Sequence, residues 1–511
     1  MKKFVLALLV GIMTVATASI AVAEVTVGGK MVTRYETWSN LNLQEGADSY
    51  TNQNFFANRV LLNVNAKLAD GVEAMVELDS ATDRWGLDPQ YTTNLATYLN
   101  HNDKSLSIRQ AWMNFMIPGL PIGMKVGHQP LALGHGIWLD TSRYGSDAIL
   151  LYSKPMPELL LAAAYVKGAE AFGFAPARAN IANRYGGGAF VAPGQTPTGS
   201  TPGAGSRSTS DADFYAALAN YTWCENNTVG VNFTFVSDNA TIGAPGSATA
   251  TRDGDITATN TALVFDGVLS GITYKGEFDW LHVNVESILA NTKDYQIDAY
   301  AAMLGGSMKF SNVTVGLETA YGSGNNRSDV NLFYNPGSGS VVATTLNTAG
   351  NAADMDHAYY TPYNSTSYNY AYLYNDKIGQ GPLGSGGGLG FGDGFGGIGL
   401  ANTFYVKLSG GMPVTEKVKV DMDVLYLSAA KTMTHAQSHD LGWEIDGHVG
   451  YELYSNLKFD LNGGYLFTGD YYEFEGHENS FASTITQDGT SSGKLKTDDA
   501  WGATAKLTVK F

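Results

Sequence analysis

Charged side chains recur at every second position in parts of this chain where the intervening residues are apolar. In residues 59–79, Arg59 and Lys67 precede Glu73, Glu77 and Asp79 in this spacing. Successive side chains of a β-strand point to opposite faces, so these charges would share one face. The same reasoning predicts this set of water-facing charges: Lys30, Arg34, Glu36, Arg59, Lys67, Glu73, Glu77, Asp79, Arg109, Lys125, Glu444 and Asp446. Rings and ladders of charge set ion selectivity in a channel. For any single residue, a merely solvated strand face is the alternative.

The signs of these charges bear on selectivity. Arg34, Arg59 and Arg109 would form a basic ladder beside the acidic strand 72–81, which predicts a transverse field across a narrow pore. The formal net charge is −17, and it becomes −19 without Lys2 and Lys3. This balance favours cations at the mouth.

The sequence contains no recognisable motif for catalysis, haem attachment or nucleotide binding. None of the nine histidines belongs to a recognisable nucleophile motif, and His-Glu-x-x-His does not occur, so we expect no catalytic residue and no enzyme. One cysteine, Cys224, allows neither an internal disulfide nor a c-type haem attachment. The glycine run 379–399 lacks the βαβ context of a dinucleotide site. We therefore expect no cofactor and no nucleic-acid partner. Ca²⁺ on the aspartates of 238–257 is one option, and a solvated loop is the other.

The elements that must carry these residues are strands. Apolar and polar residues alternate through most of the chain, and the i, i+3, i+4 spacing of a helix is absent from 59–79. Turn signals divide the pattern into eighteen candidate strands, with sixteen as the alternative count. The predicted strands are 25–37, 55–68, 72–81, 105–117, 122–130, 147–153, 158–168, 211–224, 228–237, 255–266, 271–287, 294–310, 313–321, 401–410, 416–428, 439–453, 457–468 and 498–511.

Connection length and composition predict how these strands are arranged. Short connections such as 69–71 alternate along the chain with long ones such as 169–210 and 322–400. The mean hydropathy is −0.11, and aromatics make up 12% of the residues. These features are typical of an all-β, transmembrane antiparallel β-barrel with short periplasmic turns and long external loops. A lipid environment requires closure, because every backbone polar group must be paired within the protein. At sixteen to eighteen strands, the barrel would enclose an aqueous channel.

The two ends of the chain indicate its destination. Residues 1–23 have two lysines, an apolar run and Ala21-Val22-Ala23, which predicts a cleaved signal peptide and a barrel domain over 24–511. The last residues, AKLTVKF, alternate and end on Phe511. This ending resembles the C-terminal signature of Gram-negative outer-membrane proteins. The resemblance implies that Phe511 is an assembly signal for the barrel-assembly machinery.

Residues 107–136 resemble a hairpin of general porins, in which the second strand ends in Gly-Arg-Gln. The matching residues are Gly127, His128 and Gln129, so the arginine is replaced and its role is not carried over. A weaker likeness to alginate-export-like barrels rests on strand count, and no substrate is transferred from it. The porin resemblance implies a bacterial outer-membrane barrel in contact with lipid and lipopolysaccharide, as a monomer or a homo-trimer.

Two loops compete to narrow the channel. Residues 131–146 contribute His135, Asp140 and Arg143, and the tyrosine-rich part of 322–400 contributes Tyr368 and Tyr370. The tyrosines of 356–376 could stack on sugars or aromatic solutes. The alternative for the long loop is an external position.

The sequence therefore predicts a porin for passive diffusion of small hydrophilic solutes or ions, with a cation preference. The alternatives are a substrate-specific uptake channel, a sheath around a multihaem cytochrome, and a soluble β-rich binding protein.

Overall fold

The computed structural model describes residues 24–41, 43, 53–80, 83–85, 106–142, 145–169, 212–224, 226–240, 254–285, 295–324, 330–335, 340–346, 359, 368–378, 400, 402–431, 438–472 and 497–511. The predicted signal peptide 1–23, Arg143 and most of 169–210 lie outside these residues. Among the described residues, no helix is long and apolar enough to cross a membrane.

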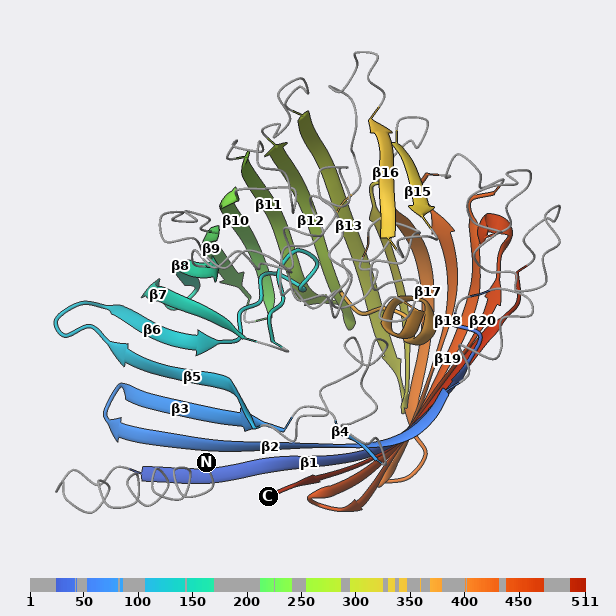
Figure 1. Cartoon of the computed structure of the whole chain (residues 1–511). Coiled ribbons are helices and arrows are strands. Elements are labelled where there is room, and N and C mark those ends of the chain that lie inside the picture. Colours follow the sequence, from blue (N-terminus) through green and yellow to red (C-terminus); the bar gives the residue numbers. More distant parts are fainter. Residues whose placement is uncertain are drawn as a thin grey trace.

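Eighteen long strands form one antiparallel sheet (Figure 1). Their bounds are β1 Glu24–Ser39, β2 Gln53–Ala69, β3 Val72–Asp79, β5 Ser107–Met116, β6 Ile122–Gln129, β7 Ser146–Met156, β8 Leu159–Ala169, β9 Ala212–Trp223, β10 Asn227–Ala240, β11 Gly254–Leu269, β12 Ile272–Val285, β13 Tyr295–Phe310, β14 Val313–Gly322, β17 Thr403–Pro413, β18 Val418–Ala429, β19 Asp440–Tyr454, β20 Leu457–Thr468 and β21 Ala500–Lys510. A two-residue strand, β4 (Asp83–Arg84), adds to β2.

The sheet closes on itself. Each long strand pairs with its neighbours in chain order, and β1 also pairs with β21, from Lys30 opposite Lys510 to Ser39 opposite Trp501. Closure leaves no long strand with an unpaired edge. The prediction of an eighteen-stranded antiparallel barrel is confirmed, and the sixteen-stranded alternative is wrong.

Short and long connections alternate, as predicted. The short turns lie between β2 and β3, β5 and β6, β7 and β8, β9 and β10, β11 and β12, β13 and β14, β17 and β18, and β19 and β20. At one of them, Ser270 and Gly271 have φ angles of 52° and 83°. Positive φ at both positions is the mark of a type I′ two-residue hairpin turn, which favours glycine.

The long connection 322–400 contains elements that the sequence did not predict. Strands β15 (Val330–Asn335) and β16 (Ser340–Leu346) pair in a separate hairpin, and a turn of π-helix, η3, covers Tyr372–Ile378. Figure 1 shows this coil on the concave side of the sheet, where it contacts β19, β20 and β21. A 3₁₀ turn, η4 (Asp470–Tyr472), follows β20.

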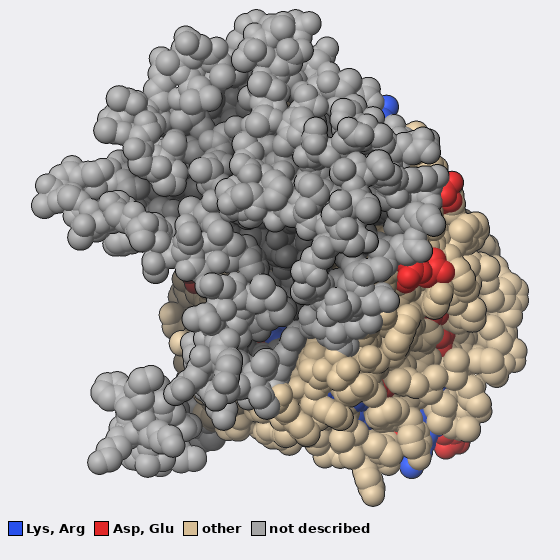
Figure 2. All heavy atoms as spheres, turned by 45° about the vertical axis from the view of Figure 1, so that its right-hand side comes forward, with Lys and Arg blue, Asp and Glu red and all other residues tan. Residues whose placement is uncertain are grey.

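The two faces of the barrel wall differ in polarity. On β12, Phe278 and Trp280 are 47% and 56% exposed, whereas the alternating residues Glu277 and Asp279 are 2% and 0% exposed. On β19, Trp443 is exposed and Glu444 is buried. In the view of Figure 2, most of the described surface is neither acidic nor basic. Apolar side chains therefore face outward, and polar ones face the lumen.

Candidate functional site: the narrowed lumen

Of the connections that the structure describes, two segments lie inside the barrel, and we call them the first and second inner segments. The first inner segment is 131–142, between β6 and β7, and the second is 368–378, which includes η3. Ile137 and Trp138 of the first and Leu373 of the second belong to one buried cluster with inward-facing residues of several strands. Both loops that were predicted from the sequence to narrow the channel therefore reach the lumen.

The first inner segment is a compact turn seated on β12. Its backbone closes through hydrogen bonds from Leu133 N to Leu139 O at 3.0 Å and from Thr141 N to Leu131 O at 2.7 Å. His135 N donates to Glu277 Oε2 at 2.5 Å. Gly134 has a φ of 55°, and a Cβ atom there would lie 2.5 Å from both carboxylate oxygens of Glu277. Only glycine allows this close approach.

The second inner segment is held by a carboxylate pair on β19. Leu373 N and Tyr374 N donate to the two oxygens of Glu444 at 2.5 and 2.9 Å, and Tyr372 N donates to Asp446 Oδ2 at 3.0 Å. The first backbone N–H groups of a helical turn have no partner within the turn, so the carboxylates satisfy donors that would otherwise be unpaired. This contact explains why Glu444 is completely buried.

Glycines on the wall make room for the second segment. A Cβ atom at Gly464 would lie 2.5 Å from Asp446 Oδ1 and 2.9 Å from Tyr372 Cδ1, and one at Gly502 would lie 3.1 Å from Leu373 Cδ2. At the other end of the segment, Lys377 Nζ lies 3.7 Å from Glu36 Oε2 and 3.3 Å from Asp376 Oδ2. Burial alone would lower the pKa of Lys377, but these two carboxylates raise it, so this lysine is charged at neutral pH.

The tyrosines of this region pack on the wall. The rings of Tyr370 and Tyr405 stack with centroids 4.3 Å apart, and the Tyr405 hydroxyl donates to Glu318 Oε1 at 2.7 Å. Tyr370 and Tyr374 are 4% and 1% exposed. Because their rings are already covered by protein, these two tyrosines are not available to stack on a solute. Tyr368 is half-buried, and its hydroxyl oxygen lies 3.2 Å from that of Tyr405.

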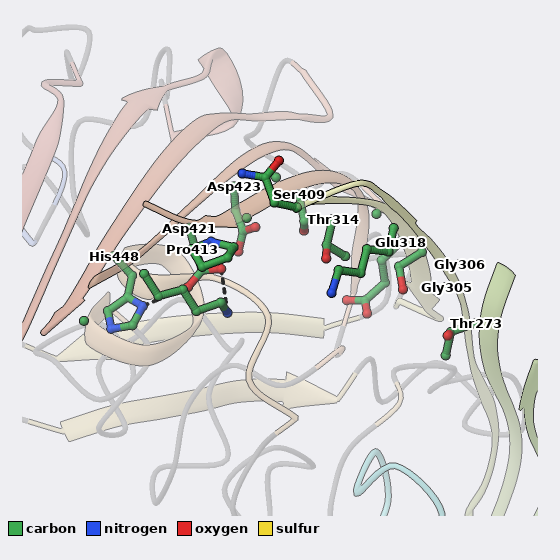
Figure 3. A pocket seen from close by; sticks show the side chains of 18 of the residues that line it. Thr273, Gly305, Gly306, Thr314, Glu318, Ser409, Pro413, Asp421, Asp423 and His448 are labelled. Atoms are coloured by element: carbon green, nitrogen blue, oxygen red, sulfur yellow. Dashed lines mark hydrogen bonds and ion pairs between the residues drawn. The ribbon is translucent and has the colours of Figure 1, made fainter. Parts of the chain in front are cut away.

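A cavity of about 940 Å³ follows the wall from this region toward the short turns. Its lining includes Lys275, Lys407 and Glu318, where the two lysines contact Glu318 at 2.6 and 3.0 Å. Figure 3 shows Asp421, Asp423 and His448 along another part of the same lining. Lysines and carboxylates thus share this space, which suits hydrophilic solutes. The sequence analysis did not single out this set.

The predicted charges on the early strands form pairs on one wall. Arg59 Nε donates to Asp79 Oδ1 at 3.0 Å, and Arg109 Nη1 donates to Glu77 Oε1 at 2.5 Å. Arg34 Nε lies 2.8 Å from Glu36 Oε1. Basic and acidic groups are therefore interleaved within one strand or between neighbouring strands, and not set on opposite sides of the lumen as a transverse field requires.

The remaining predicted residues have the following positions. Lys67 is opposite Glu73 in the β2–β3 register, Lys30 is opposite Lys510, and Lys125 Nζ lies 3.9 Å from the centre of the Trp112 ring. In the first inner segment, Asp140 Oδ1 accepts from Ser142 N at 2.8 Å, and its backbone bridges to Ala132. Phe511 follows β21 and exchanges backbone hydrogen bonds of 2.8 and 3.1 Å with Gly29.

Glu277 and Asp279 are further lumen residues that were not predicted from the sequence. Asn260 Nδ2 donates to Asp279 Oδ1 at 2.7 Å, and the Tyr359 hydroxyl faces the same carboxyl group. Burial and the neighbouring Asp279 raise the pKa of Tyr359. A usable signal was present, because Glu-x-Asp occurs at 77–79, 277–279 and 444–446, and only the first and last were singled out.

No three His, Cys, Asp or Glu side chains within the described part of the chain are arranged to hold a metal ion. Of the segment 238–257, nominated for Ca²⁺, only the ends inside β10 and β11 are described.

Comparisons with known proteins identify similar barrels. No protein-family model matches the chain, and no curated protein matches it. The outer membrane protein OpdK from Pseudomonas aeruginosa is similar at 11% identity with a TM-score of 0.49, over 95% of this chain and 98% of that one. A BenF-like porin from Pseudomonas fluorescens has 10% identity and a TM-score of 0.47, over 96% and 99%. OpdO from Pseudomonas aeruginosa has 12% identity and a TM-score of 0.48, over 96% and 97%.

Proposed function

We propose that the protein is a porin of the bacterial outer membrane that passes small hydrophilic solutes through a lumen narrowed by the two inner segments. The observation that carries this proposal is the inverted wall of the barrel, where apolar side chains such as Trp280 and Trp443 are exposed and carboxylates such as Asp279 and Glu444 are buried. A charged residue facing lipid at mid-membrane would cost about 2–4 kcal/mol, so this polarity fits a barrel surrounded by lipid.

The inner segments bear on which kind of porin this is. Both are fixed by hydrogen bonds to buried carboxylates, and the cavity beyond them has a volume of about 940 Å³, within the range of sites for single small molecules. This geometry favours a substrate-restricted uptake channel over a wide general pore. The interleaved charges of the early strands give no support to a cation preference, and nothing in the described residues favours a cytochrome sheath.

The test is single-channel conductance of the refolded protein in a planar bilayer under a salt gradient. We expect discrete steps of low conductance, and the reversal potential gives the charge preference. Exclusion of polyethylene glycols of increasing size gives the width of the constriction. A folded, inserted barrel that carries no ions and releases no small solute from vesicles would refute the proposal.

Two further expectations belong to the same proposal. The barrel-assembly machinery is expected to recognise the strand that ends in Phe511, and replacing Phe511 with Ser would reduce the amount assembled in the outer membrane. Whether the barrel is a monomer or a homo-trimer is decided by its mass in mild detergent. Contact with lipid and lipopolysaccharide follows from the proposed location.

A further inference from the structure

The pair Glu277 and Asp279 lacks a positive partner within the part of the chain that the structure describes. Both side chains are buried, and they lie two residues apart on one face of β12, which places their Cα atoms about 7 Å apart. Among the described residues, no lysine or arginine contacts either carboxylate. The nearby imidazole of His135 is directed to Asp266, at 3.5 Å. A buried carboxylate without a compensating charge is strongly destabilising.

The oxygen atoms around this pair are also incompletely paired. Glu277 Oε1, Asp279 Oδ2, Asn260 Oδ1 and the Tyr359 hydroxyl are buried, and none of them has a hydrogen-bond partner outside this group among the described residues. Asn260 is 2% exposed, and its amide group is already directed at Asp279 through the 2.7 Å hydrogen bond. A shared proton would pair two of these oxygens. A cation would pair several at once and supply the missing charge.

We propose that a calcium-like divalent cation binds between Glu277 and Asp279, with the amide oxygen of Asn260 and the hydroxyl of Tyr359 as neutral ligands. Calcium takes carboxylate, amide and water oxygens in a flexible arrangement of six to eight ligands, whereas Mg²⁺ demands a near-ideal octahedron. The lack of histidine or cysteine ligands disfavours zinc and copper. To present its oxygen, the Asn260 amide would turn over, a change that leaves its outline unaltered.

The position of the site gives the cation a structural consequence. Glu277 also accepts the backbone N–H of His135, and Trp138 lies against Tyr359 with ring centroids 6.2 Å apart. A bound cation would therefore hold β11, β12, the first inner segment and Tyr359 together. This inference does not depend on whether the barrel conducts.

The experiment uses the chain 24–511 refolded in detergent without lipopolysaccharide and stripped of metal with EDTA. Calorimetric titration with Ca²⁺ gives the stoichiometry, and Tb³⁺ emission sensitised through Trp138 and Tyr359 reports binding near these rings. We expect one Ca²⁺ per chain, with weaker binding of Mg²⁺. Asp279→Asn and Glu277→Gln should abolish this binding. Asp446→Asn, in the matched pair on β19, should retain it.

Asn260→Asp gives a result that misfolding cannot imitate. It adds a third carboxylate of the same shape, and Ca²⁺ affinity rises with ligand charge, so we expect binding to tighten about tenfold. The proposal is overturned if the stripped protein shows no saturable binding, if Asp279→Asn binds as the original does, or if Asn260→Asp binds no more tightly. The first result would leave a shared proton as the means by which this pair is neutralised.

Discussion

Glu277 with Asp279 on β12 and Glu444 with Asp446 on β19 are the same two residue types at the same spacing, and each pair is covered by an inner segment. The β19 pair accepts three backbone N–H groups from the second segment. The β12 pair accepts one from the first segment and one from the Asn260 side chain. The difference shows that a carboxylate pair on the wall has no fixed role, because the segment packed against it decides how the charge is compensated.

The third pair, Glu77 with Asp79 on β3, extends this comparison. Within the described ranges neither inner segment donates a backbone N–H group to it, and it is compensated by Arg109 and Arg59 from the neighbouring strands. The sequence Glu-x-Asp therefore has different partners at three places in one barrel. Backbone N–H groups contact it on β19, arginines contact it on β3, and an incompletely paired group of oxygens surrounds it on β12.

The largest expected effect comes from Glu444→Ala. It removes the acceptor of two buried backbone N–H groups, and leaving a buried donor unpaired costs about 1–3 kcal/mol, so the seating of the second segment should weaken by about 2–6 kcal/mol. Single-channel recordings should show higher conductance or flicker, and larger polyethylene glycols should enter. Glu158→Gln, an exposed carboxylate in the short turn between β7 and β8 and outside the lining of the cavity, is the control. Unchanged conductance and size exclusion would contradict the anchoring role.

Gly464→Ala tests the seat of the same segment. Its Cβ atom would press on Asp446 and Tyr372, and overpacking of this kind costs about 1–3 kcal/mol. Urea unfolding in lipid vesicles should show this loss. The neighbouring Gly463 has its nearest atoms at 3.4 and 3.8 Å, so Gly463→Ala should be nearly neutral. Equal losses in the two variants would show that the second segment does not rest on Gly464.

Asp79→Asn and Asp279→Asn should change the free energy of unfolding in opposite directions, or only Asp79→Asn should lower it, when divalent cations are absent. Asp79→Asn loses its contact with the partly exposed Arg59, which should destabilise the barrel by about 1–2 kcal/mol. Asp279→Asn removes an uncompensated buried charge and should leave the free energy of unfolding unchanged or raise it. Unfolding in EDTA measures both. A large loss in Asp279→Asn would indicate a positive partner for that carboxylate.

The smallest effect is expected for Gly134→Ala compared with Gly119→Ala. Both glycines have positive φ, at 55° and 79°, so both substitutions carry a similar backbone penalty. Only Gly134 faces Glu277, whereas a Cβ at Gly119 would meet nothing within 4 Å. We expect Gly134→Ala to lower the free energy of unfolding by about 1 kcal/mol more than Gly119→Ala does, and to alter the fluorescence of the buried Trp138. If the two variants had the same stability and the same Trp138 fluorescence, the first inner segment would be able to move away from β12 without cost.

The sequence by itself determined the wall of the barrel. Alternation with period two predicted all eighteen strands, since one face of each strand must be apolar and the other polar along its whole length. The same pattern placed Glu77, Asp79, Glu444 and Asp446 on one face. It could not distinguish them, because period two states which face a side chain occupies and nothing about what lies opposite.

Only the tertiary structure decided what fills the lumen. The contacts of His135 with Glu277 and of Tyr374 with Glu444 join residues 142 and 70 positions apart, and no local pattern encodes such distances along the chain. A β-bulge between Glu77 and Leu78 brings both Arg109 and Gln110 to Glu77, which strict alternation would not predict. Local polarity determines the strands. The constriction depends on loops whose backbone N–H groups bind buried carboxylates on strands far away in the sequence.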